Sequence, residues 1–485
     1  TRAYEQEGTI PYRPWTDILR ALLQDLPLAE IMNMLEEKTD PGETAGALHH
    51  VATAQAKLAR LSSLLPELAT HQELSLPPNR PATPEQERLY LWEAVLSLLN
   101  ALSQFTPLLL VLDDLHWTDD SSLELLAYLA RHQPNERIMW IGTCQEMELA
   151  PSASLRALLN DLRREQMLVT LPLQPLSSTE IARLLAHVPR TILQSIQSQS
   201  GGNPLFAEEL ARFSEAMPLE SSQNESYYPG HELRTGLKGP SLPETIAAVL
   251  ERRLNTLNGD CQALLSKAAV LGGSFELRML LRMMGEAGPG EDTALDLLEA
   301  ALRSGLLTEE ASGGRIVYHF WHPLIVSHLY ERLSAARRAQ LHRRAASALI
   351  ELHTDSEAEV AAAITHHLSK YGQEKQQLAC YAEMAGNQAR AISAYPEALY
   401  YYRQALEALH TLRNTTSPQK QNPLRLANLL ECLAECNDVQ GNYQEALQQY
   451  IQVLELHNAY QIDVGAFDTP QEWLAWQQEE AQVQA

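Results

Sequence analysis

The sequence predicts an α/β part that is followed by a mainly helical part. Short apolar runs at 107–114, 138–143 and 167–171 alternate with helical segments, which is the strand–helix rhythm of a doubly wound parallel sheet. Beyond residue 334 only helical patterns occur, and two segments there place small and aromatic residues in similar positions. We therefore expect an incomplete parallel sheet first and a tetratricopeptide-like α-solenoid last.

Composition narrows the classes of protein that fit. A chain of 485 residues, 45% of them hydrophobic, can form about three globular domains. Its net charge of −24 disfavours broad binding to nucleic acid or to an anionic membrane. No apolar run approaches the ~18 residues of a transmembrane helix. The 5 scattered cysteines do not form a disulfide framework, which favours a cytoplasmic setting.

Two capping boxes predict where helices begin. In such a box an N-cap Ser or Thr and a Gln or Glu further along exchange hydrogen bonds with each other's backbone. Thr83 with Gln86 predicts a helix that runs to about Phe105. Ser121 with Glu124 predicts the start of the next one.

The apolar runs predict strands. The run at 107–114 has five consecutive apolar residues and ends in two acids, as expected for a buried parallel strand. The runs at 138–143 and 167–171 predict two further strands, with a helix over about 153–165 between them. Leu306–Thr308 and Ile316–Tyr318 flank Ser-Gly-Gly and predict a β-hairpin, so that the small helical unit around it suggests a winged helix.

Shifts in composition predict the boundaries between domains. Ser, Asn, Glu, Pro and Gly dominate residues 216–241, where apolar residues are sparse, which is typical of a linker. The expected order is an α/β domain at 1–175, a helical segment at 176–215, the linker at 216–241, a winged-helix-like domain at 242–333 and helical repeats at 334–485.

Several motifs together resemble one family. They are Tyr-Glu-Gln-Glu-Gly at 4–8, Leu-Asp-Asp-Leu-His-Trp at 112–117, Gly-Gly-Asn-Pro-Leu-Phe at 201–206, Leu-Pro-Glu-Thr-Ile at 242–246 and His-Phe-Trp-His-Pro-Leu-Ile at 319–325. Their order and spacing resemble the STAND-class signal-transduction ATPases (AAA/NB-ARC-like and Orc1-like) of bacterial transcriptional regulators, cyclases and kinases, over nearly the whole chain. The resemblance implies a P-loop-type nucleotide-binding domain, a helical lid, a winged helix and a helical-repeat sensor.

The resemblance implies that the acids at 113–114 form a Walker B site. Asp113 would hold Mg²⁺, directly or through water, because a hard cation prefers carboxylate oxygen and a strand end fixes the carboxylate. Asp114 would orient or deprotonate the attacking water. The alternative is that adjacent acids at a strand end only begin a loop. Trp117 more readily fits packing than nucleotide contact, and for His116 both remain open.

Thr143 lies where the family senses the γ-phosphate of ATP. An arginine is usual nearby in the family, and this sequence has Gln145 instead. A neutral amide cannot stabilise transition-state charge as a guanidinium does. We therefore expect this protein to bind and exchange nucleotide better than it hydrolyses it.

Two later residues match nucleotide contacts of the family. Pro204 matches the lid proline that packs on adenine, although proline also suits the first turn of a helix. His322 matches the winged-helix histidine that contacts the β-phosphate of ADP, although a lone histidine is usually structural. Both interpretations stay open for each residue.

The sequence lacks the phosphate-binding loop that ATP binding requires. Such a loop has the pattern Gly-x-x-x-x-Gly-Lys-Ser/Thr, whose backbone amides, lysine and hydroxyl bind phosphates and Mg²⁺. No Gly-Lys pair occurs in the chain. In the family the loop would lie upstream of Thr1. Either the sequence is a truncated piece of a working switch, which the match starting near Thr1 favours, or it is a pseudo-ATPase. Residues 1–485 alone are expected to bind ATP weakly or not at all and to be inactive.

The predicted function is an ATP/ADP- and Mg²⁺-dependent regulatory switch, an ATPase in its full-length form. The resemblance implies that its repeats sense a protein or small-molecule effector and that the ATP state can form a homo-oligomer, without membrane or direct nucleic-acid binding. The alternative is a nucleotide-independent tetratricopeptide scaffold. DNA binding by the winged helix is a third possibility, which the acidic balance disfavours.

No metal site is predicted among the histidines and cysteines. His366 and His367 are neighbours on a helix and should point in different directions. Cys432 and Cys436 stand one helical turn apart, but nothing nearby completes a ligand set, so helix packing is the better explanation.

Overall fold

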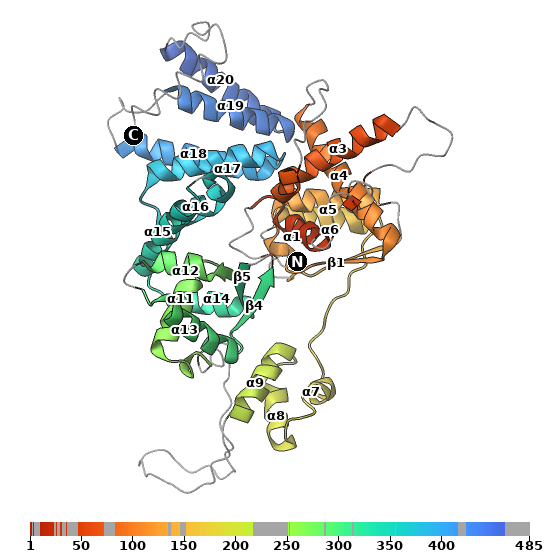
Figure 1. Cartoon of the computed structure of the whole chain (residues 1–485), viewed down its shortest axis with the longest axis vertical. Coiled ribbons are helices and arrows are strands. Elements are labelled where there is room, and N and C mark those ends of the chain that lie inside the picture. Colours follow the sequence, from red (N-terminus) through yellow and green to blue (C-terminus); the bar gives the residue numbers. More distant parts are fainter. Residues whose placement is uncertain are drawn as a thin grey trace. The chain divides into compact units, whose positions relative to one another are not determined.

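The computed structural model divides into two compact units, Thr1–Leu168 with Ala336–Ala485, and Val169–Ala335 (Figure 1). The sequence motifs at 4–8 and 242–246 and nearly all of the predicted linker lie outside the described residues. The structure describes residues 1, 3, 10–23, 26, 30–31, 35, 47–71, 83–133, 137–145, 152–216, 251, 253–285, 288–312, 315–354, 356–415 and 423–460.

A parallel pair of strands forms the centre of the α/β part of the first unit. Strand β1 (Leu108–Leu112) pairs with β2 (Ile138–Gly142) in parallel, with Leu108 opposite Ile138. The first residues of the chain run along the other side of β1. The Thr1 amine donates to Val111 O (2.9 Å), Asp113 N donates to Thr1 O (2.9 Å) and Ala3 N donates to Asp113 O (3.0 Å). These bonds have the alternation of a parallel ladder, so β1 lies between two neighbours.

One face of this sheet packs on helices, and the other is exposed. The inward side chains of β1 and β2 join a hydrophobic core with α1 (Arg13–Leu23), α3 (Ala47–Leu64), α4 (Pro84–Phe105), α5 (Asp120–His132) and α6 (Ala153–Arg164). Leu109 and Met139 on the outward face are 60% and 61% exposed. The two parallel strands are confirmed, but the prediction that 107–114 is buried throughout is wrong, because described residues cover only one face.

The helix starts follow local hydrogen bonding. Thr83 and Gln86 form the predicted capping box of α4. The box predicted at Ser121 is wrong. The N-cap of α5 is Asp119, whose carboxylate accepts from Ser122 N at 2.8 Å. Aspartate is as good an N-cap as serine, so the helix begins earlier than expected.

The strand predicted at 167–171 does not form. The segment has no regular secondary structure and pairs with no described strand, and Val169 and Leu171 are 83% and 79% exposed. A strand needs a neighbour for its N–H and C=O groups. An apolar run indicates that a segment favours the strand conformation. It does not indicate whether a neighbouring strand is present to pair with it.

The second unit begins with three helices. They are α7 (Ser178–Leu184), α8 (Arg190–Gln199) and α9 (Pro204–Ala216). They pack around a small core that includes Ile181, Leu185 and Leu210. The helical segment predicted over these residues is confirmed.

The rest of the second unit combines helices with a small antiparallel sheet. The sheet has 3 strands in the order β3-β5-β4, with Phe275, Tyr318 and Phe320 packed together. The predicted hairpin is confirmed as the β4–β5 pair, with Leu307 opposite Phe320, whereas β3 was not expected. The elements are α11 (Gly259–Ala268), β3 (Ser274–Glu276), α12 (Leu277–Met284), α13 (Glu291–Arg303), β4 (Leu307–Ser312), β5 (Arg315–Phe320) and α14 (Pro323–Glu331).

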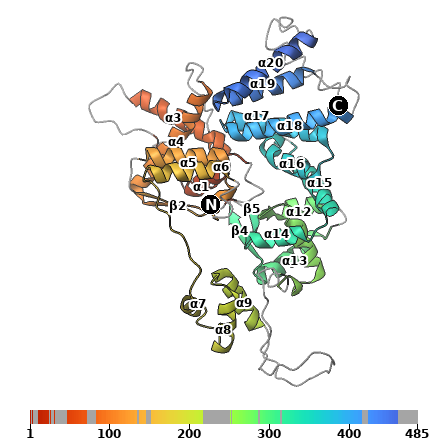
Figure 2. The ribbon, with the colours of Figure 1, turned by 180° about the vertical axis from the view of Figure 1, so that it is seen from behind.

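Paired helices complete the first unit, as the sequence predicts. In Figures 1 and 2 consecutive helices from α16 to α20 lie side by side. Gly386 of α17 faces Tyr402 of α18, and a Cβ at that position would lie 2.6 Å from the ring, so a small residue is needed for the close approach. The helices are α15 (Ala335–Leu352), α16 (Glu357–Tyr371), α17 (Lys375–Ala391), α18 (Tyr395–Thr415), α19 (Pro423–Val439) and α20 (Tyr443–Tyr460). Of the helices that the structure describes, none has the length and apolarity needed to cross a membrane.

Candidate functional site

The carboxyl end of β1 carries two adjacent aspartates. Asp113 directly follows the strand, and Asp114 has a left-handed backbone (φ 60°, ψ 48°). Aspartate tolerates this conformation better than most residues other than glycine. The chain then turns into the short 3₁₀ helix η3 (Leu115–Trp117). Both carboxyl groups therefore lie at the end of the sheet where open α/β folds bind ligands.

Thr143 joins the ends of β1 and β2. Its Oγ1 donates to Asp113 Oδ1 at 2.5 Å and accepts from Asp114 N at 2.9 Å. Main-chain bonds from Thr143 N to Leu112 O (3.0 Å) and from Leu115 N to Thr143 O (2.8 Å) hold the same junction. The structure thus brings together three residues predicted for the site, Asp113, Asp114 and Thr143.

This junction, here called the strand-end site, offers only oxygen ligands. Thr143 is exposed and the two aspartates are half-buried, so a ligand from solvent can reach them. Carboxylate and hydroxyl oxygens are what Mg²⁺ prefers. The site fits a hydrated hard cation held by Asp113, with a second carboxylate beside it.

Three residues near the strand-end site, His116, Trp117 and Gln145, differ in burial and contacts. Trp117 is half-buried and its ring lies 5.0 Å from that of His116, centroid to centroid. Both ring nitrogens of His116 are buried and make no hydrogen bond within the described part of the chain. Gln145 is exposed shortly beyond β2.

Pro204 and His322 belong to the second unit, and each begins a helix. Pro204 is the first residue of α9, where Asn203 Oδ1 accepts from Phe206 N at 3.2 Å. His322 is the N-cap of α14, and its Nδ1 accepts from Leu324 N at 3.1 Å. A neutral imidazole that accepts at Nδ1 carries its proton on Nε2. Both residues therefore have the structural role that the sequence left open, and His322 also has an N–H donor at Nε2.

A buried ionic cluster connects α9 with the residue before His322. Glu209 is buried and pairs with Arg253 (2.7 Å) and more distantly with Arg212 (3.8 Å). Both guanidinium groups lie over the ring of Trp321, at 5.6 Å for Arg212 and 5.9 Å for Arg253. These charge and cation–π contacts hold the Pro204 helix and the β5–α14 connection together within the second unit.

A second pair of acids, which the sequence analysis missed, lies at the start of α5. Asp119 Oδ1 accepts from Ser122 N (2.8 Å) and from Tyr12 N (3.1 Å). Glu397, in the first turn of α18, accepts from Ser121 N at 3.1 Å and from the Ser121 hydroxyl, although it lies 276 residues further along the chain. A carboxyl group of the repeat region therefore caps the helix that follows the strand-end site.

Burial controls the charge of this pair. Asp119 and Glu397 are 3% and 5% exposed. Burial raises the pKa of each carboxyl group, and the charge of Asp119 raises the pKa of Glu397 further. Asp119 Oδ2 is buried without a hydrogen-bond partner among the described residues. The pair is thus poised to hold at least one proton near neutral pH.

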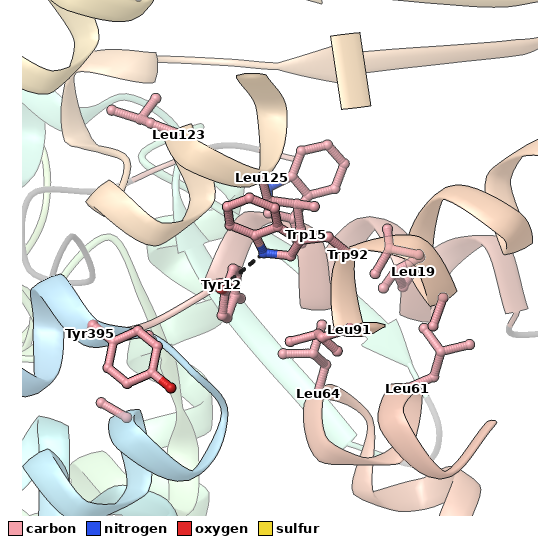
Figure 3. Close-up of a cluster of buried hydrophobic side chains, with 14 of the residues drawn as sticks. Tyr12, Trp15, Leu19, Leu61, Leu64, Leu91, Trp92, Leu123, Leu125 and Tyr395 are labelled. Carbon is pink, nitrogen blue, oxygen red and sulfur yellow. Dashed lines mark hydrogen bonds between the residues drawn. The ribbon is translucent and has the colours of Figure 1, made fainter. Parts of the chain in front are cut away.

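Aromatic side chains surround this junction, here called the α5–α18 contact. The Trp92 indole N–H donates to Tyr12 Oη at 3.2 Å, as Figure 3 shows. Trp15 Nε1 donates to Ser122 O (3.0 Å), and Tyr395 Oη donates to Pro84 O (3.2 Å). Tyr12 has a positive φ of 55° and is fully buried, so this segment has a structural role in the core.

The sequence contains a signal for Asp119 but none for Glu397. Asp119 stands directly before a helical pattern, where aspartate is a recognised N-cap, and this could have been read. Glu397 lies in a helix start of the repeat region and has no local feature that distinguishes it from a solvated glutamate.

Comparisons with known proteins agree with this organisation. Residues 1–141, which include the strand-end aspartates and β1, match the family model described as the AAA ATPase domain. The N-terminal part of the chain is thus similar to AAA ATPase domains. This match agrees with the ATPase part of the predicted recognition.

Two similar proteins give little information about function. An uncharacterized protein of Rhizobium meliloti (strain 1021) is 24% identical over 354 residues, which cover 69% of this chain and 31% of that protein. The chain thus spans about a third of the length of this curated relative. A solved STAND protein with a tetratricopeptide repeat sensor, from Pyrococcus horikoshii, is 12% identical and superimposes over 84% of this chain and 70% of that one, with a TM-score of only 0.28, too low to argue from.

Proposed function

We propose that this chain is the regulatory module of an ATP/ADP-dependent switch whose helical repeats act as the sensor. The observation that carries the proposal is the strand-end site, in which Asp113, Asp114 and Thr143 meet at the carboxyl end of a parallel strand inside an AAA ATPase domain. Paired carboxylates beside an adjacent-strand hydroxyl suit nucleoside triphosphate chemistry with a divalent cation.

Each residue of the strand-end site has a separate role in this proposal. Asp113 holds Mg²⁺, which neutralises phosphate charge when it is bound with the nucleotide. Asp114 accepts a hydrogen bond from the attacking water and orients it. Thr143, at hydrogen-bond distance from Asp113, senses the γ-phosphate from the end of the neighbouring strand. Gln145 supplies no positive charge, so exchange of nucleotide exceeds hydrolysis.

In this proposal the second unit supplies a helical lid and a winged helix. Pro204 packs on adenine and His322 donates from Nε2 to the β-phosphate. The tautomer set by the Leu324 N–H supports the role of His322. The Glu209 cluster supports a joint movement of both residues, because it ties their helices together.

In this proposal the phosphate-binding loop is supplied by sequence outside residues 1–485, which contain no Gly-Lys pair. The outward face of β1 and β2 supports this, since Leu109, Val111, Met139 and Ile141 are 60%, 38%, 61% and 37% exposed. Parallel sheets are normally covered on both faces, so a further strand and helix would pack here.

The α5–α18 contact transmits the state of the sensor to the strand-end site. Helix α5 follows η3 and the two strand-end aspartates directly, and Glu397 caps its first turn. Movement of α18 would remove that cap and shift the segment that carries Asp113 and Asp114.

The effector binds to the helical repeats, and nucleotide exchange then promotes assembly with further copies. The outer face of α20 supports a protein contact, because Tyr443, Leu447 and Leu454 are exposed there. For a small effector, a cavity of about 370 Å³ lies between α5, α6 and the repeats, lined in part by Glu124, Arg131 and Gln440.

Calorimetric titration with Mg-ATP tests the proposed function. Residues 1–485 should show no saturable binding, whereas the protein made from its complete reading frame should bind. In that protein Asp113→Asn should weaken Mg-ATP binding at least about tenfold, or about 1.4 kcal/mol, while Glu407→Gln, at an exposed acid of α18, should leave it unchanged.

Two outcomes would reject the proposal. Tight binding by residues 1–485 would show that the phosphate loop is not needed. Absence of binding by the complete protein would favour the nucleotide-independent repeat scaffold. The missing Gly-Lys pair and Gln145 also favour that alternative. A gel shift on random duplex DNA at low salt separates both from DNA binding by the winged helix.

A further inference from the structure

Three histidines outside the strand-end site converge between the first two helices of the repeat region. His342 comes from α15, and His366 and His367 from α16. One ring nitrogen of each lies within 4.8 Å of the others. Because neighbours on a helix diverge, the sequence does not predict a metal pair at His366 and His367. In the structure His342, on the preceding helix, lies close to both.

The packing holds these rings in place. His342 Nδ1 and His367 Nδ1 are 2.8 Å apart and share a proton in a hydrogen bond. The ring centroid of His342 lies 5.1 Å from that of His367 and 6.0 Å from that of His366. Ala346, Ile364 and Leu368 pack the same two helices together. His342 and His367 are buried, and His366 is partly exposed, which gives the cluster one side open to solvent.

The cluster consists of uncharged nitrogen ligands. Burial lowers the pKa of His342 to about 3 and that of His366 to about 4, with a contribution from the nearby Lys370 ammonium, and it lowers the pKa of His367 as well. Burial thus favours the unprotonated form of the three rings. Metal binding by imidazole requires this form.

We propose that His342, His366 and His367 bind one divalent transition-metal ion, of the kind represented by Zn²⁺, between α15 and α16. Imidazole suits Zn²⁺, Co²⁺, Ni²⁺ and Cu²⁺, whereas Mg²⁺ and Ca²⁺ need oxygen ligands, and the cluster contains no carboxylate. Three histidines with water as the fourth ligand is a recognised arrangement for zinc. The open side at His366 admits the ion and that water.

Binding needs only small movements and no loss of protons. Zn–N distances of about 2.0–2.1 Å place the nitrogens of two tetrahedral ligands about 3.3 Å apart. His342 and His367, whose Nδ1 atoms are 2.8 Å apart, must therefore separate slightly, and His366 must approach them by at most about 1.5 Å. The proton shared by these two Nδ1 atoms moves to an Nε2, and both rings stay neutral. The ion then cross-links α15 to α16, where the repeat region starts.

Lys370 limits the affinity. It follows His366 by four residues on α16, so the two side chains are neighbours on that helix. A positive charge there opposes a divalent cation. The site should therefore bind reversibly, and Lys370→Gln should tighten binding several-fold.

Titration of the untagged, chelator-treated chain with Zn²⁺ and with Co²⁺ tests this site. We expect one equivalent of Zn²⁺ to bind and Co²⁺ to give the visible absorption of a tetrahedral complex, with no response to Mg²⁺. His366→Gln, which changes the least buried ligand, and His367→Gln should each weaken binding by ~100-fold or more, since loss of a group that merely supports a ligand already costs about 10–100-fold. His353→Gln, after the end of α15, is the matched control and should change nothing.

Three results would overturn the proposal. They are the absence of saturable Zn²⁺ binding by the unaltered chain, binding that survives both His366→Gln and His367→Gln, and an equal loss in His353→Gln. Far-UV circular dichroism without metal shows whether each variant is folded. If His367→Gln is not folded, Zn²⁺ binding by His366→Gln, at the partly exposed ligand, and by Lys370→Gln still tests the proposal.

Discussion

Two pairs of acids lie close together in this chain and do opposite things. Asp113 and Asp114 stand half-buried at the carboxyl end of β1, where a threonine hydroxyl is a partner and solvent has access. Asp119 and Glu397 are buried and accept mainly from backbone N–H groups of α5. The same chemical group is therefore accessible to a ligand from solvent in one place and a buried helix cap in the other.

The short distance between the pairs connects the two roles. Only η3 and the turn after it separate the strand-end site from the N-cap of α5. One acid of the buried pair belongs to the repeat region and the other to the part that matches the AAA ATPase domain. In the proposed switch, a change in the repeats would reach the strand-end site through a single turn of chain.

The largest expected effect is on folding, at Glu397. Glu397→Ala leaves the Ser121 N–H and hydroxyl buried without acceptors, which should lower the free energy of unfolding by about 2–4 kcal/mol. Glu397→Gln keeps an uncharged acceptor and should cost less than about 1 kcal/mol. Urea denaturation measures both.

Matched variants sharpen this contrast between the pairs. Glu407→Ala changes an exposed acid of the same helix, and Asp113→Asn changes the accessible pair. Each should alter the free energy of unfolding by less than about 0.5 kcal/mol. If Glu397→Ala behaves like them, the α5–α18 contact has no structural importance.

A smaller effect is expected from pH. Burial, followed by the charge of Asp119, raises the pKa of Glu397 to about 8, and burial raises that of Asp119 to about 6. Between the unfolded values of ~4 and these values the folded state binds more protons than the unfolded state, so stability falls as pH rises. The contribution is complete below about pH 4 and is lost through about pH 8.

The difference between Glu397→Gln and the unaltered chain isolates this effect. The difference in the free energy of unfolding between the two proteins should shift in favour of the glutamine variant by more than about 1 kcal/mol from about pH 5 to about pH 9. The buried histidines have lowered pKa values, so their effect on stability has the opposite sign. Through them the folded state loses stability as pH falls below about 6.5. They affect both proteins equally and cancel in the difference. A difference that is constant with pH would mean that Glu397 is ionised throughout.

Local features of the fold could be predicted from the sequence. The α4 capping box, both parallel strands and the β4–β5 hairpin each depend on residues that are close in the chain. Asp113, Asp114 and Thr143 were found because strand ends meet at one edge of a parallel sheet. Such signals need no knowledge of distant packing.

Features that depend on distant partners could not be predicted. Residues 167–171 have strand propensity but no described neighbour to pair with. Glu397 has a role only because α18 packs on α5, and His342 only because α15 packs on α16. No pattern within either segment records these contacts.

Release of bound ADP tests the central claim most directly, that the repeats control the strand-end site through Glu397. The measurement is the dissociation rate of a fluorescent ADP analogue from the protein made from its complete reading frame. We expect Glu397→Ala to accelerate release by about tenfold, equivalent to about 1.4 kcal/mol, while Glu407→Ala leaves it unchanged. An unchanged rate in a folded Glu397→Ala protein would contradict the account.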